Sequence, residues 1–413
     1  MSSTLRSWLD DWESKRGQER AFRVRWLLNP DEMPLGNVEI VEQDGVVTEI
    51  RSLPASASDI LPVIVTPTFI NPHTHLEFSS LRQPLTPPLP FPDWIKSVIQ
   101  WRRNEGVDTD PAIRLGLAES LHGGVTAVGE ITTAQHIGLE DLADSCSVVS
   151  FREFIGLRQD RIPELLRQAA DHLSQAVESG GSNTVTFGIS PHAPYTVHPE
   201  LFASLVELSM ERNAVVAMHL AETRDELQLL TDGTGRFADF LSELGLWDAA
   251  TFPGGRSIRE FLEQLAQVPK ALAIHGNYFS NADIAFVAQH PNIATVYCPR
   301  THAFFQHSPH PMLQLLAAGA RVILGTDSRA SNPDLSIWKE LQFAATHCPD
   351  IPIPQLLAMI TTHAADAMGL PPDRHEIRAG AALRWVLLNA DVEINDLRRL
   401  IANSSTQPLT VMK

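Results

Sequence analysis

The sequence has little of several things that whole classes of protein require. Only three of its 413 residues are cysteine, and Cys146, Cys298 and Cys348 lie far apart, which favours a reducing compartment over a disulfide framework. No apolar run approaches the roughly 20 residues that cross a bilayer. The charged N-terminus does not resemble a signal peptide. We therefore expect a cytoplasmic protein with no membrane partner.

Positive charge is also scarce. The chain has 32 Lys and Arg against 49 Asp and Glu, for a formal net charge of −17. Phosphate binding needs a surplus of basic residues, so this balance argues against a nucleic-acid partner. Hydrophobic residues make up 44% of the chain, which allows a large core. The length suits a barrel with a companion domain rather than one small domain.

Short apolar runs alternate with helical stretches through the middle of the chain. Such runs are typical of parallel strands that are covered on both faces, and eight of them over roughly 300 residues favour a (β/α)8 barrel. The Gly-x-Gly-x-x-Gly motif of a dinucleotide-binding sheet follows none of the first strands, which weakens an open-sheet alternative. The eight runs begin at Val63, Thr126, Val148, Val185, Val215, Ala271, Ala294 and Val322.

The two ends of the chain have a different pattern. Phe22–Leu28 and Asn37–Val41 alternate as hairpin strands do, and Leu383–Leu388 and Leu409–Met412 are again strand-like. We interpret both ends as one small, discontinuous β domain. The expected boundaries are residues 1–60 and 371–413 for this domain and 61–370 for the barrel.

Two connections are too long for plain turns. They are Phe78–Asp110, which is rich in proline, and Glu222–Arg256. Long loops at the C-terminal face of a barrel are usually functional. Trp94 and Trp101 are seven residues apart, so they would share one helix face, either in a substrate lid or in core packing.

Residues with metal-binding and acid–base chemistry follow the apolar runs, where the strand ends of a barrel meet its active site. His73 and His75 are two apart in an extended segment and so point the same way. A lone His-x-His is a weak signal, but His219, His275 and Asp327 end three further runs. Imidazoles with one carboxylate suit zinc or iron.

Four motifs in order resemble the amidohydrolase superfamily, in its branch of ring deaminases and triazine hydrolases. They are Pro67-x-Phe-Ile-Asn-Pro-His-Thr-His-Leu-Glu77, His219-Leu-Ala-Glu222, His275-Gly-Asn277 and Gly325-Thr-Asp-Ser328. The resemblance, which extends to aminofutalosine, S-adenosylhomocysteine and cytosine deaminases, runs from about residue 63 to residue 370. It implies a barrel with a small β-sandwich beside it.

The resemblance also implies roles for individual residues. His73, His75, His219 and Asp327 would be the metal ligands. Glu222 would shuttle protons, and His275 would hold the attacking hydroxide. His192 would contact the substrate. Binuclear relatives bridge two metals with a carbamylated lysine from the fourth strand. The five lysines, Lys15, Lys96, Lys270, Lys339 and Lys413, all lie elsewhere, so we expect one metal ion, zinc or alternatively iron.

These residues predict a hydrolytic deaminase of an amino-substituted heterocycle, with purine and adenosine derivatives such as aminofutalosine ahead of small bases. Metal-bound hydroxide would attack the amino-bearing carbon and release ammonia. The alternative is hydrolysis of a cyclic amide, alkylamine or halide at the same site. A metal-bound scaffold without catalysis is a third hypothesis, which Glu222 argues against.

Several further residues have two readings each. His302 and Arg300 are candidate substrate contacts, and Arg300 with Arg329 would meet an acidic arm, unless both are solvated charges. Cys298 fits a buried thiol better than a nucleophile. Arg152 and Arg158 fit surface positions. The partner we expect is a small heterocyclic molecule, and a homodimer is left open.

Overall fold

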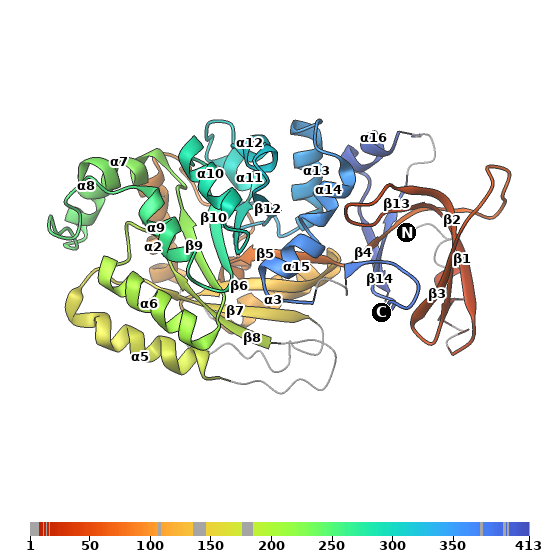
Figure 1. The fold of residues 1–413 in the computed structure, drawn as a ribbon, viewed down its shortest axis with the longest axis horizontal. Helices are drawn as coiled ribbons and strands as arrows, with labels where there is room; N and C mark the ends of the chain where they lie inside the picture. The colour runs from red at the N-terminus through yellow and green to blue at the C-terminus, as the bar shows by residue number, and fades with distance from the viewer. Residues whose placement is uncertain are drawn as a thin grey trace.

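The computed structural model describes residues 8–10, 12, 13, 15, 17–105, 109–134, 146–175, 185–371, 375–390, 394 and 396–412. Figure 1 shows an α/β barrel domain and, beside it, a smaller β domain that carries both ends of the chain. The predicted fold class is confirmed: eight strands form one parallel sheet, and the strands from the two chain ends form a second, mixed sheet.

The eight barrel strands follow one another in sequence order, and each pairs in parallel with the next. An isolated parallel bridge between Thr74 and Asp327 joins the first strand to the end of the last. Every residue of β6 and β7 is buried, as expected for strands covered on both faces. The strands are β5 (Phe69–Thr74), β6 (Val125–Thr132), β7 (Ser147–Phe154), β8 (Val185–Pro191), β9 (Val216–Leu220), β10 (Ala271–His275), β11 (Ile293–Tyr297) and β12 (Arg321–Leu324).

The expected first barrel strand was wrong. The run Val63–Val65 lies in β4 (Leu61–Pro67), which pairs with β1 and β13 of the smaller sheet. The first barrel strand is β5, which begins at Phe69 and already contains His73. The chain therefore passes from one sheet to the other between Pro67 and Phe69. The domain boundaries at residues 60 and 370 stay predictions.

The smaller domain is one six-stranded sheet in the order β14-β13-β4-β1-β2-β3. Its remaining strands are β1 (Arg20–Leu27), β2 (Leu35–Gln43), β3 (Val46–Ser52), β13 (Trp385–Asn389) and β14 (Pro408–Met412), so the strands predicted at both ends are confirmed. A bridge between Val46 and Ala382 brings β3 towards the start of β13, which shows that the sheet curls. Phe22 and Trp385 pack together in its core.

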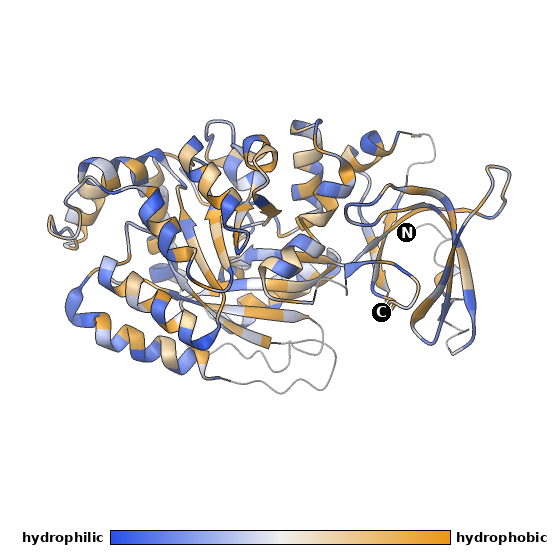
Figure 2. Cartoon of the chain, in the orientation of Figure 1, coloured by the Kyte–Doolittle hydropathy of each residue, from blue (hydrophilic) through white to orange (hydrophobic). Residues whose placement is uncertain are grey.

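Helices follow most barrel strands, and Figure 2 shows them with mixed hydropathy around largely hydrophobic strands. Helix α6 has proline in its first turn and ends at the left-handed Asn213, while a Ser280–Asp283 capping box begins α10. The helices after the first four strands are α2 (Phe91–Glu105), α3 (Thr109–His122), α5 (Ile162–Leu173) and α6 (Pro199–Arg212), with the short η1 (Leu76–Phe78) and η2 (Gln159–Arg161).

The two long connections contain helices rather than irregular loop. Helix α2 lies in the first, and α7 (Arg224–Asp232) and α8 (Arg236–Glu243) lie in the second. The later helices are α9 (Ile258–Leu265), α10 (Asn281–Gln289), α11 (Pro299–Phe304), α12 (Met312–Ala317), α13 (Ile337–His347), α14 (Ile353–Ala358), α15 (Thr362–Ala367) and α16 (Leu397–Ala402). Among the described residues, no helix has both the length and the apolar character needed to cross a membrane.

Candidate active site

Five side chains meet at the C-terminal ends of four barrel strands. His73 lies in β5 with His75 just after it, His219 lies in β9, His275 ends β10, and Asp327 follows β12. Their ligand atoms form two overlapping groups, one with His75 and Asp327 and one with His219 and His275, and His73 belongs to both. Within each group the atoms lie within 4.8 Å of one another.

The cluster has the donor geometry of a metal site. The Nε2 atoms of His75 and His219 are 3.2 Å apart, and the Asp327 Oδ1 atom is 3.5 Å from His73 Nε2. The His219 Nδ1 atom lies 3.0 Å from the His192 backbone oxygen, to which only a protonated nitrogen can donate. The Nε2 lone pair of His219 therefore faces the cluster.

Burial keeps these imidazoles neutral, which is their metal-binding form. It lowers the pKa of His73 well below the usual value, and it lowers the pKa of His219 to about 4. Neither ring nitrogen of His73 makes a hydrogen bond with a described residue. Because a buried polar atom without a partner costs free energy, this orphaned ring fits a site that a metal ion completes.

The backbone at three strand ends adopts the left-handed region, which few residues other than glycine occupy. The φ angles are 53° at Ala221, 72° at His275 and 60° at Asp327. Hydrogen bonds between neighbouring strands hold these bends. The amide of Asp327 donates to the His73 oxygen at 3.1 Å, and that of Gly276 donates to the Leu220 oxygen at 3.0 Å. Such strain concentrates at functional sites.

Glu222 lies beside the cluster without belonging to either ligand group. Its Oε1 atom is 3.4 Å from His275 Nε2, and the side chain is buried. Burial raises the pKa of Glu222 well above its usual value, and the negative Asp327 and Glu226 raise it further. A carboxyl group with a raised pKa is better suited to act as a general acid than an ordinary glutamic acid.

Glu226 fixes the backbone that carries Glu222. Its two carboxylate oxygens accept from the amides of Ala221 at 2.9 Å and Glu222 at 2.7 Å. The Asn277 side-chain amide also donates to the backbone oxygen of Glu222, at 3.0 Å. Glu226 was not singled out from the sequence, although it lies in the first turn of α7, where a carboxylate can accept from backbone amides at the start of a helix.

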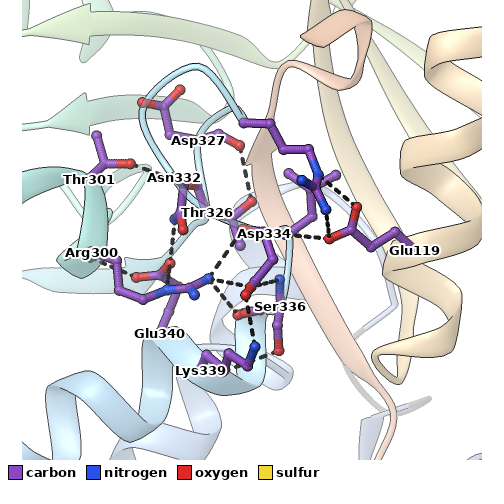
Figure 3. Close-up of polar contacts among 12 residues, drawn as sticks. Glu119, Arg300, Thr301, Thr326, Asp327, Asn332, Asp334, Ser336, Lys339 and Glu340 are labelled. Atoms are coloured by element: carbon purple, nitrogen blue, oxygen red, sulfur yellow. Dashed lines mark hydrogen bonds and ion pairs between the residues drawn. The ribbon is translucent and has the colours of Figure 1, made fainter. Parts of the chain in front are cut away.

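A buried polar network supports Asp327 from below (Figure 3). Ser331 donates its hydroxyl to Asp327 Oδ2 at 2.7 Å, and the Asn332 amide donates to the Thr326 oxygen at 2.8 Å and to Glu340 at 2.7 Å. Glu340 is fully buried on α13. The network therefore connects the metal-facing carboxylate to the helix behind the eighth strand.

Arg300 belongs to this network rather than to the substrate cavity. Its guanidinium donates to Glu340 Oε1 at 2.7 Å and to Asp334 Oδ1 at 2.9 Å. It is not among the described residues that line the cavity. The structure gives no support to the expected substrate contact by Arg300 and instead shows a buried ion pair.

We expect Arg300→Met to destabilise the fold. The variant leaves the buried Glu340 carboxylate without its charge partner, and breaking a buried pair in this way costs about 3–5 kcal/mol. Chemical denaturation of the metal-loaded protein measures this loss, and Arg167→Met, which removes an exposed arginine outside the cavity lining, is the matched control. Unchanged stability with a raised KM would instead indicate that Arg300 binds substrate.

The other predicted cationic and imidazole contacts also lie apart from the cavity. His302 Nε2 is 2.9 Å from the Ser308 backbone oxygen, and Arg329 pairs with Glu119 at 2.9 Å. His192 differs from them: it lines the cavity, and its Nδ1 atom is 2.6 Å from Thr196 Oγ1. Cys298 is buried, and burial raises its pKa well above the usual value, as expected of an inert thiol.

A cavity of about 540 Å³ opens above the cluster. His75, His219, Glu222, His275 and Asp327 form part of its lining, and apolar side chains from α2 and α8 form much of the rest. The helix α2 contributes Phe91, Trp94, Ile95, Val98, Ile99, Arg102 and Arg103, and the segment from α8 to residue 246 contributes Phe240, Leu241, Leu244 and Leu246. Trp94 lines the cavity, whereas Trp101 packs on Phe78.

Two cavity features were missed in the sequence. Glu153 is the penultimate residue of β7, two residues after the apolar run that ends at Phe151, so it lies close to the strand-end position that identified the other site residues. Arg102 lies on α2. Its guanidinium donates at 2.5 Å to the carboxylate of Glu77, the residue two positions after His75. Arg158, expected at the surface, lines the cavity with Arg102, Arg103 and Arg161 and pairs with Asp160.

Comparisons with known proteins agree with this geometry. A 5-methylthioadenosine/S-adenosylhomocysteine deaminase from Pyrococcus abyssi is 27% identical over 379 residues, which cover 87% of this chain and 81% of the relative. The structure of Helicobacter pylori aminofutalosine deaminase superposes with a TM-score of 0.76 at 19% identity, over 95% of this chain and 98% of that one. A zinc-bound adenosine deaminase from Xanthomonas campestris gives a TM-score of 0.70 at 19% identity, over 95% and 91%.

The two structures show a shared fold. The family is shown by a match over residues 64–406, which span the barrel and the return into the smaller sheet. Together with the buried histidine and aspartate cluster at the strand ends, this match establishes that the chain belongs to the Amidohydrolase family and is a hydrolase of non-peptide carbon–nitrogen bonds.

Proposed function

We propose that the chain is a metal-dependent deaminase that hydrolyses the 6-amino group of an adenine-type nucleoside. The observation that carries this proposal is the position of Glu222. It is a buried carboxyl with a raised pKa, and it lies 3.4 Å from His275 and beside the metal-fitting cluster at the floor of a cavity. A purely structural metal site has no use for an acid in that position.

One divalent ion would be held by His73, His75, His219 and Asp327, and we propose zinc, with iron as the alternative. The zinc-bound Xanthomonas relative supports this choice. Such an ion lowers the pKa of a bound water towards ~7 and so supplies a hydroxide nucleophile at neutral pH. The described strand β8 contains no lysine that could bridge a second ion.

Side chains of the protein would then transfer protons and stabilise charge during the reaction. Glu222 protonates the ring nitrogen next to the amino-bearing carbon, which makes that carbon more electrophilic. His275 faces the same carbon and stabilises the negative charge that develops on the oxygen bound to it. The reaction breaks the carbon–nitrogen bond, forms a carbon–oxygen bond, and transfers the protons of one water molecule so that the nitrogen leaves as ammonia.

The cavity supports a substrate larger than a bare base. Its floor is polar, whereas its walls from α2 and α8 are mainly apolar, which suits a flat ring with an attached arm. Arg300 and Arg329 are not among the described residues that line the cavity, so they no longer support a carboxylate on that arm. A carboxylate on that arm would instead be bound by the arginines that line the cavity, which are Arg102, Arg103, Arg158 and Arg161.

We expect adenosine, 5-methylthioadenosine and S-adenosylhomocysteine to give kcat/KM values at least tenfold above cytosine, which corresponds to about 1.4 kcal/mol of transition-state stabilisation. Ammonia release over this panel measures the ranking. A preference for cytosine would overturn the substrate class. Hydrolysis of alkylamine, halide or cyclic amide substrates without ammonia release from adenine nucleosides would favour the alternative reaction.

We also propose a cytoplasmic location for the enzyme.

A further inference from the structure

The proposed mechanism assigns no role to Glu153, a buried glutamic acid at the cavity. Glu153 is the penultimate residue of β7, and its side chain is 3% exposed. It lines the cavity, yet its Oε1 atom accepts no hydrogen bond from a described residue. A carboxylate oxygen accepts hydrogen bonds, so this atom calls for a donor that none of the described residues provides.

The neighbouring His192 is too far away to be that donor. His192 Nε2 lies 4.0 Å from Glu153 Oε1, beyond hydrogen-bond distance. Because His192 Nδ1 is engaged with Thr196, its Nε2 atom is the one available to a ligand. A ligand group placed beside both residues could reach the two of them.

A second metal ion does not explain Glu153. Glu153, His192 and His219 do form a group whose ligand atoms lie within 4.8 Å. However, His219 donates from Nδ1 to the His192 oxygen, so it has a single lone pair, and that one faces His75 at 3.2 Å. Without His219 only two ligands remain, which is fewer than a protein site normally supplies.

Arg102 has an unused hydrogen-bond donor in the same cavity. Its Nε–H is buried and makes no hydrogen bond with a described residue. Its guanidinium is close enough to Glu153 to oppose the rise in pKa that burial causes. The cavity therefore contains one unused acceptor atom on Glu153 and one unused donor atom on Arg102.

The chemistry of an adenine nucleoside limits what could satisfy Glu153. The only N–H donors of its base are on the amino group that leaves, and N1, N3 and N7 are acceptors. In adenosine and 5-methylthioadenosine the remaining donors are the sugar hydroxyls, each of which both donates and accepts. This step rests on the proposed function, since it assumes that the amino group faces the cluster.

We infer that Glu153 is a specificity residue that accepts a hydrogen bond from a ribose hydroxyl, with the neighbouring hydroxyl available to Arg102. The enzyme would then select ribonucleosides over nucleosides that lack the vicinal diol. A site built to bind a hydroxyl rejects the analogue without it, because its buried polar groups are left without partners.

The test compares adenosine with 2′,3′-dideoxyadenosine as substrates of the zinc-loaded enzyme. Wild type should prefer adenosine by about ten- to hundredfold in kcat/KM, the usual contribution of a hydrogen bond to a charged group. Glu153→Ala should lose most of this preference, through slower adenosine turnover and unchanged dideoxyadenosine turnover. Glu153→Gln should retain part of it, and 2′- and 3′-deoxyadenosine would identify the hydroxyl.

Controls separate this inference from the proposed function. Glu164→Gln removes a carboxylate from the surface of α5 and should leave the preference unchanged. Equal losses on both nucleosides, an unchanged preference, or loss of zinc from Glu153→Gln would each overturn the role of Glu153 alone. Failure of the wild-type enzyme to release ammonia from any of the nucleosides would overturn the proposed function and, with it, this inference.

Discussion

His219→Ala is expected to lose the bound metal and the hydrolytic activity together while the barrel stays folded. His219 presents its Nε2 lone pair to the cluster, 3.2 Å from His75 Nε2. Loss of an outer partner of a metal ligand already weakens metal binding by about 10- to 100-fold, so loss of a ligand should cost more. Elemental analysis after dialysis, circular dichroism and ammonia release measure the three properties.

The matched control is His347→Ala. His347 is exposed at the end of α13 and hydrogen-bonds only to its own helix among the described residues. It should keep full metal content and activity. A His219→Ala protein that retained one metal per chain and turned over normally would contradict the ligand set.

Glu222→Gln is expected to have the opposite pattern, with full metal content and activity reduced by ~10²–10⁴, the usual size of a general acid–base contribution. The amide has the shape of the carboxyl but carries no transferable proton. Glu222 belongs to none of the candidate metal groups among the described residues, so its substitution should not release the ion.

Steady-state kinetics of the Glu222 variant should show the loss in kcat rather than in KM, because proton transfer occurs in the transition state. Glu207→Gln, on the exposed face of α6, is the matched control. Normal turnover of Glu222→Gln would remove the proton-shuttle role, and loss of metal from it would make Glu222 a ligand instead.

Residues next to the strand ends were predictable because the barrel itself imposes their position. His219, His275 and Asp327 each end or follow a buried apolar run, and the fold gathers such ends at one face. The periodicity did not reveal which sheet a run joins. Residues 63–67 and Phe69–Thr74 are both buried and are separated only by Thr68, and strand pairing alone assigns the first run to the smaller sheet.

The substrate contacts were harder to predict, because they depend on partners far away in the sequence. Arg300 looked available for a ligand, but its partner Glu340 lies 40 residues further on, in α13. Conversely, Glu153 resembled an ordinary strand end, and only the cavity and its missing hydrogen bond distinguish it. Local patterns indicate where a residue lies along the chain but not which distant side chain satisfies it.

A zinc titration of the metal-free protein, with ammonia release from adenosine as the readout, tests the central claim most directly. The four ligands and the absence of a bridging lysine in β8 predict activity that rises in proportion to zinc and saturates at one ion per chain. Saturation at two ions per chain would contradict the mononuclear site. Zinc binding without any ammonia release would contradict the deaminase.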